Sequence, residues 1–417
     1  MIKILNCKNK NFPKQLAIFL KKRRSGKNTD TKIVKKIIKD IKNNKLKAVL
    51  KYEKKFSKNK IIKPSLKKIN KSIKSLNPKI KRAIDFAYSR ILNFHIRQKF
   101  KDITYVDKFK NRLEYKYVPL SSVGIYVPSN LPSTLLMNAI PAKIAGIKRI
   151  VLANPKLNPA VLYAARKIGI KEIYCMGGAQ AIASLAYIQN VNKIVGPGNI
   201  YVAMAKKEVF GDVGIEGMIA GPSEITVVAD KKTNLDDVVT SLIAQAEHDV
   251  NSQCILITKD KNLINNLNKN ISDSLKNLPR KKIAHKSLKD NGLIIYAQND
   301  KQIIDAINEI SPEHLEINIF NYKKYLDKIY NAGSICIGKY SPMAVTDYNS
   351  GTNHVLPTMG SAKFSSGLSV SEFYKKISHI KLSKKGIEKI GEYATHLAEY
   401  EKLDGHAQSI KSRIRRK

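Results

Sequence analysis

Residues 150–209 have the sequence IVLANPKLNPAVLYAARKIGIKEIYCMGGAQAIASLAYIQNVNKIVGPGNIYVAMAKKEV, in which short apolar runs alternate with longer amphipathic stretches. The short runs are typical of buried strands, and the longer stretches are typical of helices. The expected strands cover residues 150–153, 172–176 and 193–195, and the expected helices cover residues 159–168, 179–188 and 200–209. Strands that alternate with helices in this way predict a parallel sheet covered by helices on both faces.

The same alternation returns further along the chain, after a strand expected at residues 225–229. More strands are expected at residues 254–257, 293–296 and 334–337, with helices at 263–278 and 302–310 between them. Upstream of the first set, the pattern predicts a helix at residues 80–100 and strands at 113–118 and 123–127. We therefore expect an α/β fold with two Rossmann-like, doubly wound parallel-sheet domains and helical N- and C-terminal extensions.

The chain is strongly basic, with 76 Lys and Arg residues against 33 Asp and Glu residues and a net charge of +43. A charge of this size is typical of proteins that bind nucleic acids. The basic residues are, however, spread along the whole chain, and aromatic residues are not interleaved with them as a base-stacking surface requires. The pattern favours a solvated basic surface without a specific nucleic-acid partner, and a basic nucleic-acid-binding scaffold is the alternative.

The four cysteines are isolated in the sequence, and none belongs to a Cys-x-x-Cys pair. Cys175, Cys254 and Cys336 each lie in an apolar, strand-like run, where a reduced thiol packs as a small hydrophobic group. No apolar run reaches the length of a membrane helix, and the first residues are too polar for a secretory signal. These features predict a protein of the reducing cytoplasm with no membrane partner.

Gln245 and His248 lie three residues apart in a segment with helical periodicity, so their side chains are expected on one face of a helix. An amide oxygen and an imidazole at that spacing can share one metal ion, although the pair alone is more typical of an ordinary polar helix face. Further polar clusters contain His314, His354 and His406 together with several carboxylates. Carboxylate, amide and imidazole ligands without thiolates suit zinc or a similar divalent ion.

Taken together, these clusters and their order resemble the histidinol dehydrogenase family, whose members are zinc- and NAD-dependent enzymes of the last steps of histidine biosynthesis. The segments that carry the resemblance occur in the order known for the family and span nearly the whole chain. They are residues 83–91, 124–128, 140–146, 177–183, 196–199, 220–224, 245–249, 311–316, 347–358, 364–370 and 403–407. No single segment is decisive, but the ordered set is very specific.

The resemblance implies that L-histidinol is oxidised through L-histidinal to L-histidine while two hydrides pass to two NAD molecules. Oxidation of the alcohol needs a base for the hydroxyl proton, and His314 is the residue that we choose for this role. Oxidation of the aldehyde needs water to add first, and the adjacent Glu313 is the expected base for that water. Pro312 favours a loop here, in which both neighbouring side chains can face one site.

The resemblance also implies which residues bind zinc, substrate and NAD. One zinc ion per subunit is expected on Gln245, His248, Asp347 and His406, where it would position the substrate rather than generate hydroxide. The expected substrate contacts are these four residues together with Ser223, His314, His354 and Glu401. The expected NAD contacts are Tyr126, Gln180 and Asn199.

The residues themselves give weaker support to the NAD and substrate contacts. The dinucleotide-binding pattern Gly-x-Gly-x-x-Gly does not occur in the sequence. Glycine-bearing turns at residues 177–180 and 196–199 are nevertheless expected at the carboxyl ends of strands, where α/β sheets bind anionic ligands. Each turn is equally consistent with a tight connection that only needs glycine. Ser223 likewise has a plain alternative, since next to Pro222 it can cap a turn.

The resemblance further implies the division of the chain into domains and their assembly. The expected parts are an N-terminal extension at residues 1–28, a first α/β domain with most metal and catalytic residues at 29–125 plus 225–368, a second α/β domain with the NAD contacts at 126–224, and a helical C-terminal arm at 369–417. A homodimer with shared active sites is also implied, because the arm that carries Glu401 and His406 is expected to cross to the partner subunit.

The chain departs from the family pattern in two places. Ser129 and Asn130 stand where the family usually has a glycine pair, which bears on NAD affinity. Met343 and Thr346 stand where the family usually has a glutamate and a glycine close to Asp347, which bears on metal affinity. A zinc-dependent hydrolase, which would not need NAD, is the alternative enzyme.

Overall fold

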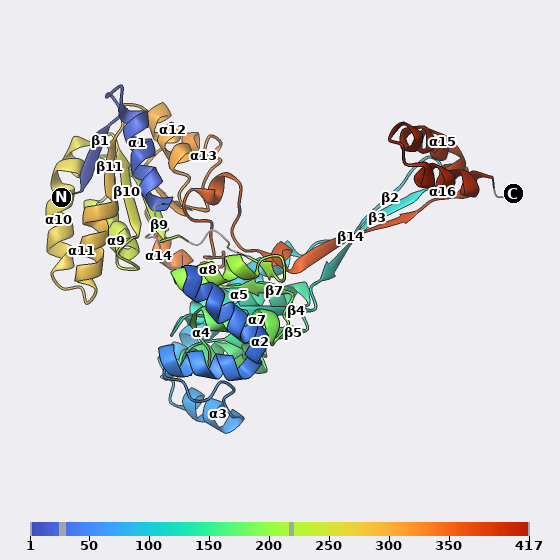
Figure 1. The fold of residues 1–417 in the computed structure, drawn as a ribbon. Coiled ribbons are helices and arrows are strands. Elements are labelled where there is room, and N and C mark those ends of the chain that lie inside the picture. The colour runs from blue at the N-terminus through green and yellow to red at the C-terminus, as the bar shows by residue number, and fades with distance from the viewer. Residues whose placement is uncertain (1, 25–30, 217–220, 416–417) are drawn as a thin grey trace.

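The computed structural model of the chain describes residues 2–24, 31–216 and 221–415. Within these residues, two parallel β-sheets of six and five strands form two α/β units, and a three-stranded antiparallel sheet extends away from them (Figure 1). The expected α/β fold with two parallel-sheet units is therefore confirmed.

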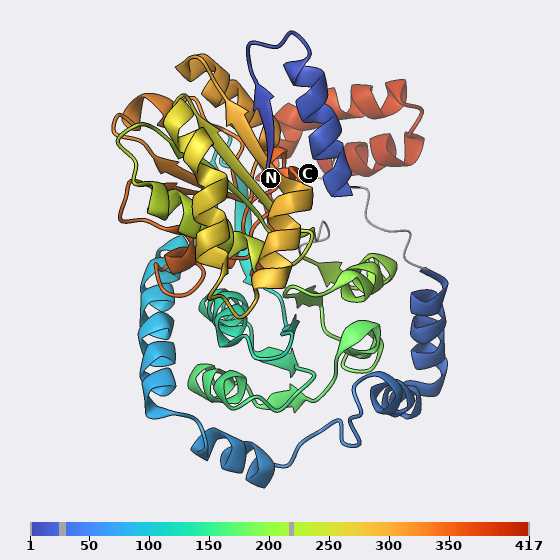
Figure 2. The same ribbon diagram turned by 90° about the vertical axis from the view of Figure 1, so that its left-hand side faces the viewer.

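The first unit is built on a parallel sheet with the strand order β1-β11-β10-β9-β12-β13. Its strands are β1 (Lys3–Asn6), β9 (Glu224–Ala229), β10 (Gln253–Thr258), β11 (Gly292–Tyr296), β12 (His314–Asn318) and β13 (Ser334–Ile337). Its helices are α1 (Phe12–Lys21), α9 (Leu235–Ala246), α10 (Lys261–Leu275), α11 (Lys281–Asn291), α12 (Asp300–Ile310), α13 (Lys323–Leu326) and α14 (Met343–Thr346). Helices α9–α11 lie on one face of the sheet and α1 and α12 on the other (Figure 1 and Figure 2). Apolar clusters between these helices and the sheet cover both faces, so β9 and β10 are buried along their whole length.

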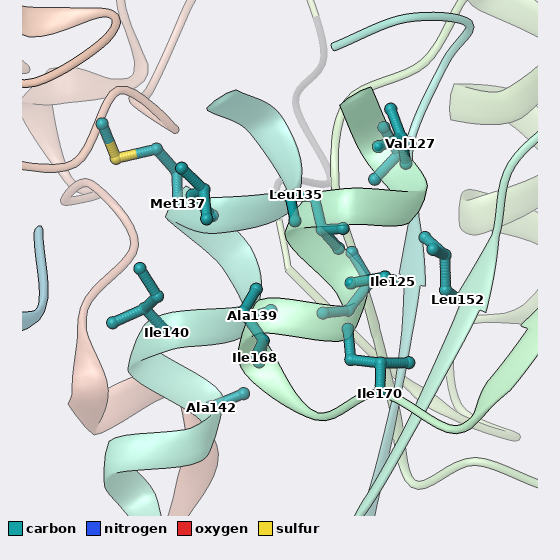
Figure 3. Close-up of a cluster of buried hydrophobic side chains, with 14 of the residues drawn as sticks. Ile125, Val127, Leu135, Met137, Ala139, Ile140, Ala142, Leu152, Ile168 and Ile170 are labelled. Carbon is teal, nitrogen blue, oxygen red and sulfur yellow. The ribbon is translucent and has the colours of Figure 1, made fainter. Parts of the chain in front are cut away.

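The second unit is built on a parallel sheet with the strand order β6-β5-β4-β7-β8. Its strands are β4 (Ser122–Tyr126), β5 (Arg149–Ala153), β6 (Glu172–Tyr174), β7 (Lys193–Val195) and β8 (Gly214–Ile215), and its helices are α5 (Pro132–Ala145), α6 (Pro159–Ile168), α7 (Gly178–Tyr187) and α8 (Ile200–Val209). Ile125 and Leu152 pack against α5 and α6 on one face, as Figure 3 shows, while Val151 and Ile194 pack against α7 and α8 on the other.

Three helices that precede this sheet also pack on the second unit. They are α2 (Thr31–Phe56), α3 (Leu66–Lys74) and α4 (Pro78–His95), of which α2 contacts α7 and α8 and α4 contacts α5. The expected grouping of residues 29–125 with residues 225–368 differs from this packing. Helical periodicity shows that a face is buried, but it does not show which sheet covers that face. The helix expected at residues 80–100 ends earlier, at His95, and a short turn of 3₁₀-helix follows it.

The residues expected as an N-terminal extension belong to the first unit wherever the structure describes them. β1 pairs with β11 at the edge of the six-stranded sheet, and Leu5 lies opposite Ile295. Leu16 and Phe19 of α1 are buried in the same unit. The expected boundary between residues 28 and 29 lies outside the described residues.

An arm made from distant parts of the chain extends from the two α/β units (Figure 1). It consists of the antiparallel strands β2 (Ile103–Val106), β3 (Arg112–Pro119) and β14 (Tyr374–Lys381), and of the helices α15 (Lys384–Tyr400) and α16 (Asp404–Ile414), which pack together at its far end. The C-terminal arm expected to be helical therefore also contains a strand, which pairs along its length with β3.

Two further expectations concern single residues and membrane spans. Cys175, Cys254 and Cys336 are buried, as expected from their apolar surroundings, and Cys7 is half-buried. In the part of the chain that the structure describes, no helix is both long enough and apolar enough to cross a membrane.

Candidate functional site

Several of the candidate residues lie at the amino ends of two neighbouring strands in the six-stranded sheet. Glu224 is the first residue of β9 and His314 is the first residue of β12, and the two strands pair so that His314 lies opposite Ile225. Glu313 lies in the bend just before β12. The loop expected after Pro312 is therefore present at Glu313 but ends before His314.

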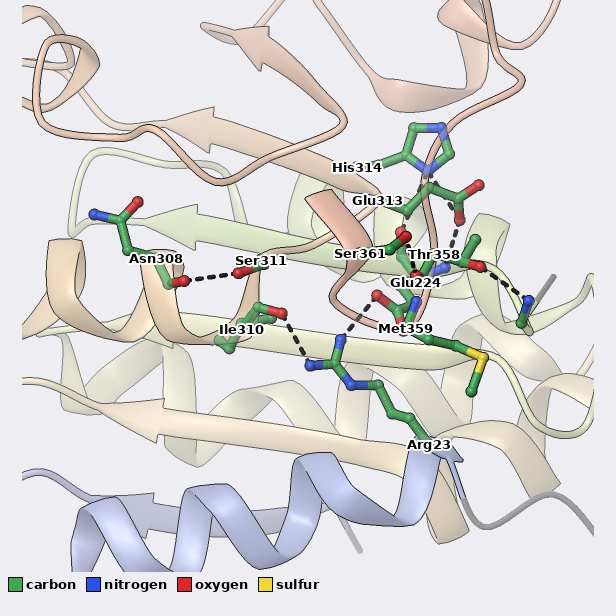
Figure 4. Close-up of polar contacts among 11 residues, drawn as sticks. Arg23, Glu224, Asn308, Ile310, Ser311, Glu313, His314, Thr358, Met359 and Ser361 are labelled. Carbon is green, nitrogen blue, oxygen red and sulfur yellow. Dashed lines mark hydrogen bonds and ion pairs between the residues drawn. The ribbon is translucent and has the colours of Figure 1, made fainter. Parts of the chain in front are cut away.

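Glu313 and His314 are buried and meet at the backbone of Glu224 (Figure 4). The backbone N–H of Glu224 donates to Oε2 of Glu313 over 2.8 Å. Nδ1 of His314 lies 3.2 Å from the carbonyl oxygen of Glu224 and 3.6 Å from Oε2 of Glu313. Because a carbonyl oxygen can only accept a hydrogen bond, Nδ1 must carry a proton and donate a hydrogen bond to the carbonyl oxygen of Glu224.

The other ring nitrogen of His314, Nε2, is buried without a hydrogen-bond partner among the described residues. It lies 3.7 Å from Oδ1 of Asp347, which is beyond hydrogen-bond distance. A neutral imidazole with its proton on Nδ1 has its lone pair on Nε2, so this atom can accept a proton. The geometry fits a general base.

The charges around His314 shift its pKa in opposite directions. Burial alone lowers the pKa of His314, but the carboxylates of Glu313 and Asp347 outweigh burial and raise it. The pKa of Asp347 is lowered although burial raises it, because the interactions with His314, His354 and His248 are stronger together. Nδ1 of His354 also lies 2.7 Å from the carbonyl oxygen of Asp347. His314 and His354 therefore lie beside Asp347, and His248 is near enough to interact with its charge.

Gln245 is fully buried near the end of α9, and neither atom of its amide group has a hydrogen-bond partner in the described ranges. A buried polar group without a partner costs about 1–3 kcal/mol, so a side chain in this state is typical of a residue that binds a ligand. Helix α9 contacts α14, and Asp347 is the residue that follows α14. An amide oxygen in this position fits the expected metal ligand.

His248 has a different local structure from the expected one. Helix α9 ends at Ala246, so His248 lies in the turn after the helix, and its backbone N–H donates to the carbonyl oxygen of Gln245 over 3.2 Å. Its side chain is exposed to solvent. The spacing between Gln245 and His248 is therefore kept by a turn instead of by a continuous helix.

Glu401 and His406 lie on the arm. Glu401 caps the end of α15, His406 lies in the first turn of α16, and both are exposed. Figure 1 shows these helices across the molecule from α9 and α14. Over residues 2–24, 31–216 and 221–415, no three His, Cys, Asp or Glu side chains of one chain are grouped so that they could hold a metal ion. One chain thus brings His248 and Asp347 into the same region but leaves His406 outside it.

The segment at residues 347–358 connects the site to the second unit. Asn353 donates from its side chain to the carbonyl oxygen of Met137 in α5 over 2.7 Å. Arg90 of α4 donates to the carbonyl oxygen of Ser350 over 2.8 Å. The segment just before β9, which carries the half-buried Ser223, is tied to residues 347–358 as well, because Gly221 donates to Oγ1 of Thr358 over 2.9 Å. The candidate site therefore lies where the two units meet.

The expected NAD contacts lie at the carboxyl ends of strands in the second unit. Strand β4 lies in the middle of the sheet, with β5 and β6 on one side of it and β7 and β8 on the other. The strand order therefore reverses between β4 and β7. Tyr126 ends β4, and Asn199 follows β7. In open α/β sheets, ligands bind where the strand order reverses in this way. A Cβ atom on Gly196 would lie 2.1 Å from the carbonyl oxygen of Tyr126, so the two chain segments are in direct contact at this point.

Each of the three expected NAD contacts also has a structural role. The hydroxyl of Tyr126 accepts from the N–H of Gly178 over 3.3 Å, and the side chain of Asn199 caps α8. The side-chain amide of Gln180 donates to Oε1 of the buried Glu53 over 2.8 Å. These contacts show that the residues at the two turns stabilise the local structure, in line with the alternative interpretation of the turns. Such a structural role does not prevent a ligand from binding at the same strand ends.

The departures from the family pattern have local explanations. Ser129 has a φ of +43°, a conformation that glycine adopts more easily, and Asn154 donates to its carbonyl oxygen over 2.7 Å. Met343 is buried in the apolar cluster of the first unit, and the hydroxyl of Thr346 donates to its carbonyl oxygen over 2.6 Å. None of these residues replaces a candidate ligand or base.

Three further residues, which were not predicted from the sequence as part of the site, are buried around the candidate residues, namely Arg23, Glu53 and Glu224. One signal was present, because a glutamate that starts an apolar strand needs a cation or several donors once it is buried. Arg23 gave no such signal, since it lies in a short basic run of a chain with 76 basic residues.

Comparison with known proteins gives a consistent result over the whole length. The family model described as histidinol dehydrogenase matches residues 20–414. The histidinol dehydrogenase of Pelagibacter ubique is 60% identical over 428 aligned positions, which cover 100% of both chains. That of Bacillus subtilis is 43% identical and covers 94% of this chain and 95% of its own. A crystal structure of histidinol dehydrogenase from Elizabethkingia anophelis superimposes with a TM-score of 0.93 at 37% identity, covering 99% of this chain and 98% of that one.

The sequence matches extend over both α/β units and the arm, and the structural match covers nearly the whole of both chains. The resemblance based on eleven short segments is thereby confirmed over the full chain. The chain therefore belongs to the histidinol dehydrogenase family, and it is an NAD-dependent oxidoreductase of histidine biosynthesis.

Proposed function

We propose that the chain converts L-histidinol through L-histidinal to L-histidine, with NAD as hydride acceptor in both steps and with Glu313 and His314 as the catalytic residues. The observation that carries this assignment is the meeting of the two side chains at the backbone of Glu224, with Nε2 of His314 unpartnered among the described residues. Family membership supplies the reaction, and the local geometry supports the roles.

In the first step, His314 acts as the general base. Its Nε2 atom takes the hydroxyl proton of histidinol while the hydrogen on the same carbon leaves as hydride to the nicotinamide ring of NAD, which gives the aldehyde and NADH. The bond from Nδ1–H to the carbonyl oxygen of Glu224 holds the ring in the tautomer that this transfer needs.

In the second step, Glu313 acts as the base for water. The water oxygen bonds to the aldehyde carbon, a water proton passes to the carboxylate of Glu313, and the carbonyl oxygen takes the proton that His314 gained in the first step, which gives the hydrate and leaves His314 neutral again. A hydroxyl proton of the hydrate then passes to His314 while the second hydride leaves to a second NAD, which gives the carboxyl group of histidine.

We also propose that one zinc ion binds to Gln245, His248 and Asp347 of one chain and to His406 of the partner subunit. The buried, unpartnered amide of Gln245 supports this assignment, as does a set of oxygen and nitrogen ligands without thiolates. The ion would hold the imidazole and the amine of the substrate in place as a Lewis acid. Neutralisation of Asp347 in this way would also weaken the attraction that raises the pKa of His314.

Substrate recognition is completed by Ser223 and His354 of the same chain and by Glu401 of the partner subunit. His354 interacts electrostatically with both Asp347 and His314. Glu401 is an exposed carboxylate of the kind that pairs with the ammonium group of histidinol.

The shared site requires a homodimer, and the arm supports one. A single three-stranded ribbon that buries neither face has little stability of its own. Apolar side chains are exposed along the arm, namely Ile103, Tyr105, Val106, Tyr115, Ile380, Tyr393, Leu397 and Tyr400. Exposed apolar surface of this extent is typical of a protein–protein interface. We propose that a two-fold symmetric dimer covers this surface, so that each chain gives one arm and receives one.

NAD is proposed to bind to the second unit, with contacts from Tyr126, Gln180 and Asn199. The reversal of strand order between β4 and β7 and the close approach of Gly196 to Tyr126 support this position. Residues 126–224 would thus form the NAD-binding part of the chain. The catalytic pair in the first unit would then face the cofactor across the contact between the units.

The direct test is an assay of purified protein with L-histidinol, NAD and zinc, in which the absorbance of NADH is followed and histidine is quantified. Two NADH for each histidine formed is the expected result. A zinc hydrolase would show no NAD dependence, and a nucleic-acid-binding scaffold would show only strongly salt-dependent binding to DNA or RNA.

A further inference from the structure

We infer that Arg23 is a positioning residue for the Glu313–His314 pair, and that it acts on the pair through Glu224. The inference rests on the proposed roles of Glu313 and His314. Arg23 itself touches neither of these side chains in the hydrogen bonds and ion pairs of the described residues.

Arg23 connects the N-terminal part of the chain to two segments beside the site (Figure 4). It follows α1, and its side chain is only 6% exposed. Its Nη1 atom lies 2.9 Å from Oε2 of Glu224, and its Nη2 atom donates to the carbonyl oxygen of Ile310 over 2.9 Å. Because the guanidinium group is planar and rigid, these two bonds fix the start of β9 relative to the end of α12.

Glu224 transmits this restraint to the catalytic pair. Its side chain is 2% exposed and is held by Arg23 on one oxygen and by the N–H of Met359, at 3.1 Å, on the other. Its backbone N–H donates to Glu313, and its carbonyl oxygen accepts from Nδ1 of His314. One residue therefore has its side chain anchored by Arg23 while its backbone orients both catalytic side chains.

The second bond of Arg23 acts on the same pair from the other direction. Ile310 ends α12, and the chain from Ile310 to Glu313 is only three residues long. Ser311 adopts a φ of +50°, and its hydroxyl donates to the carbonyl oxygen of Asn308 over 2.7 Å. The bond to Ile310 thus fixes the start of the segment that delivers Glu313 to the site.

Loss of the guanidinium group would leave the carboxylate of Glu224 buried without its cation. Such a group has to take up a proton, admit water or move, and each of these outcomes disturbs the start of β9. A misplacement of about 1 Å in a catalytic group can reduce turnover by roughly 10²-fold. Substrate and NAD binding should change little, because Arg23 contacts none of their proposed binding residues.

The test compares Arg23→Met, Arg23→Lys, Glu224→Gln and the double variant Arg23→Met/Glu224→Gln, each as the zinc-loaded enzyme. For Arg23→Met we expect kcat for histidinol oxidation to fall by about 10²-fold, with the KM for histidinol, bound zinc by metal analysis and NAD affinity by calorimetry all within threefold. Arg23→Lys keeps the positive charge but can donate to only one of the two acceptors. Its kcat should therefore lie between that of the unsubstituted enzyme and that of Arg23→Met. The double variant should be no slower than the slower single variant, because both substitutions act on one contact.

Arg149→Met is the matched control. It breaks another Arg–Glu pair, in which Nε and Nη2 of Arg149 each lie 2.8 Å from Glu172 in the second unit, and like Arg23 this arginine also donates to a backbone carbonyl oxygen, that of Gln189 over 2.7 Å. It should lower the thermal midpoint without lowering kcat. An Arg23→Met enzyme with an unchanged kcat, or with additive losses in the double variant, would overturn the inference. If Arg23→Met does not fold, an Arg23→Lys enzyme with unchanged kcat would overturn it in the same way.

The same experiment separates this inference from the proposed catalytic roles. In a Glu313→Gln background, Arg23→Met should add less to the loss of histidinal oxidation than it causes alone, because only the positioning of His314 then remains to be disturbed. If Glu313→Gln alone does not impair histidinal oxidation, the role proposed for Glu313 is wrong. Non-additivity between Arg23 and Glu224 in histidinol oxidation would still support their coupling in that case.

Discussion

Nδ1 of His314 lies 3.2 Å from the carbonyl oxygen of Glu224, and this contact determines which nitrogen of the imidazole is available for chemistry. This contact holds the proton on Nδ1, so Nε2, which has no partner among the described residues, is the nitrogen that gains or loses a proton. The asymmetry of the ring therefore comes from the backbone of a neighbouring strand. A substitution of His314 that leaves strand β12 intact but removes the basic nitrogen Nε2 therefore tests the role of this residue as a base.

His314→Asn should slow the interconversion of histidinol and histidinal in both directions. The asparagine amide can keep the contact with Glu224 but offers no basic nitrogen. A loss of about 10²–10⁴-fold in kcat is the usual scale for removal of a general base. Stopped-flow measurement of NADH with histidinol in one direction and histidinal in the other checks this, and an effect in only one direction would contradict it.

Glu313→Gln should impair histidinal oxidation by NAD far more than histidinal reduction by NADH. Only the oxidation requires water to add to the aldehyde, and the glutamine keeps the size of the side chain and can still accept from the N–H of Glu224. The loss in oxidation should again be about 10²–10⁴-fold. Equal losses in the two reactions would show that Glu313 has a different function.

Removal of the metal should abolish histidinol oxidation, and addition of zinc should restore it. His248→Ala should lose bound zinc, because it removes one of the nitrogen ligands proposed beside Asp347. His285→Ala is the matched control, since His285 is an exposed histidine on α11 and not a proposed ligand. Metal analysis after dialysis measures both, and full activity in metal-free protein would refute the assignment.

Asp300 should contribute to stability at neutral pH and less in acid. Its pKa is lowered because Lys259, Lys324 and Tyr325 bond to the carboxylate. A carboxylate with a lowered folded-state pKa stabilises the fold above its unfolded pKa of about 3.9, and this stability is lost as the pH falls through the lower folded value. Asp300→Asn should therefore cost about 1 kcal/mol at pH 7 for a partly exposed pair, and progressively less below pH ~4.

Urea unfolding at pH 7 and pH 3 measures this difference. Asp305→Asn is the control, because Asp305 is 58% exposed and pairs with Lys301 on the same helix. Its loss should be smaller than that of Asp300→Asn at pH 7. Equal losses for Asp300→Asn at the two pH values would contradict the assignment of its stability to the charged form.

The sequence predicted the parallel sheets well because their elements are buried and regularly spaced. Strand β7 and helix α8 begin and end where the pattern indicated, and β13 does as well. The pattern failed for β14, whose residues are nearly all exposed, so no alternation of apolar and polar residues marks it. Its burial would depend on a second chain, which periodicity within one chain does not report.

The candidate site, like the fold, could be predicted from the sequence only in part. His314 and Glu313 could be chosen from residue type and position, since oxidation requires bases and few histidines are present. Arg23 could not, because one arginine in a basic run is indistinguishable by sequence from its neighbours until the fold brings it to Glu224. The place of His406 could not be derived from one chain either, because α16 lies away from Asp347 within that chain.

The last prediction tests whether two chains share each site. Consider one chain that carries His248→Ala and another that carries His406→Ala, each inactive as its own homodimer. If the arm crosses, one site of the mixed dimer combines both lesions, while the other combines an intact first unit with an intact arm. Co-refolding of differently tagged variants and purification of the mixed dimer should then restore zinc binding and histidinol oxidation at one site per dimer.

If instead each arm served its own chain, every site in the mixed dimer would contain one lesion and activity would stay at the level of the parents. The exposed position of His406 at the far end of the arm favours the crossed arrangement. A second pairing sharpens the test, because chains that carry His248→Ala and Asp347→Asn both have lesions in the first unit. Neither arm can replace a ligand in the first unit, so this mixed dimer should remain inactive even though its arms are intact. Restoration in the first mixture and not in the second therefore requires that His406 reach the metal ligands of the partner subunit.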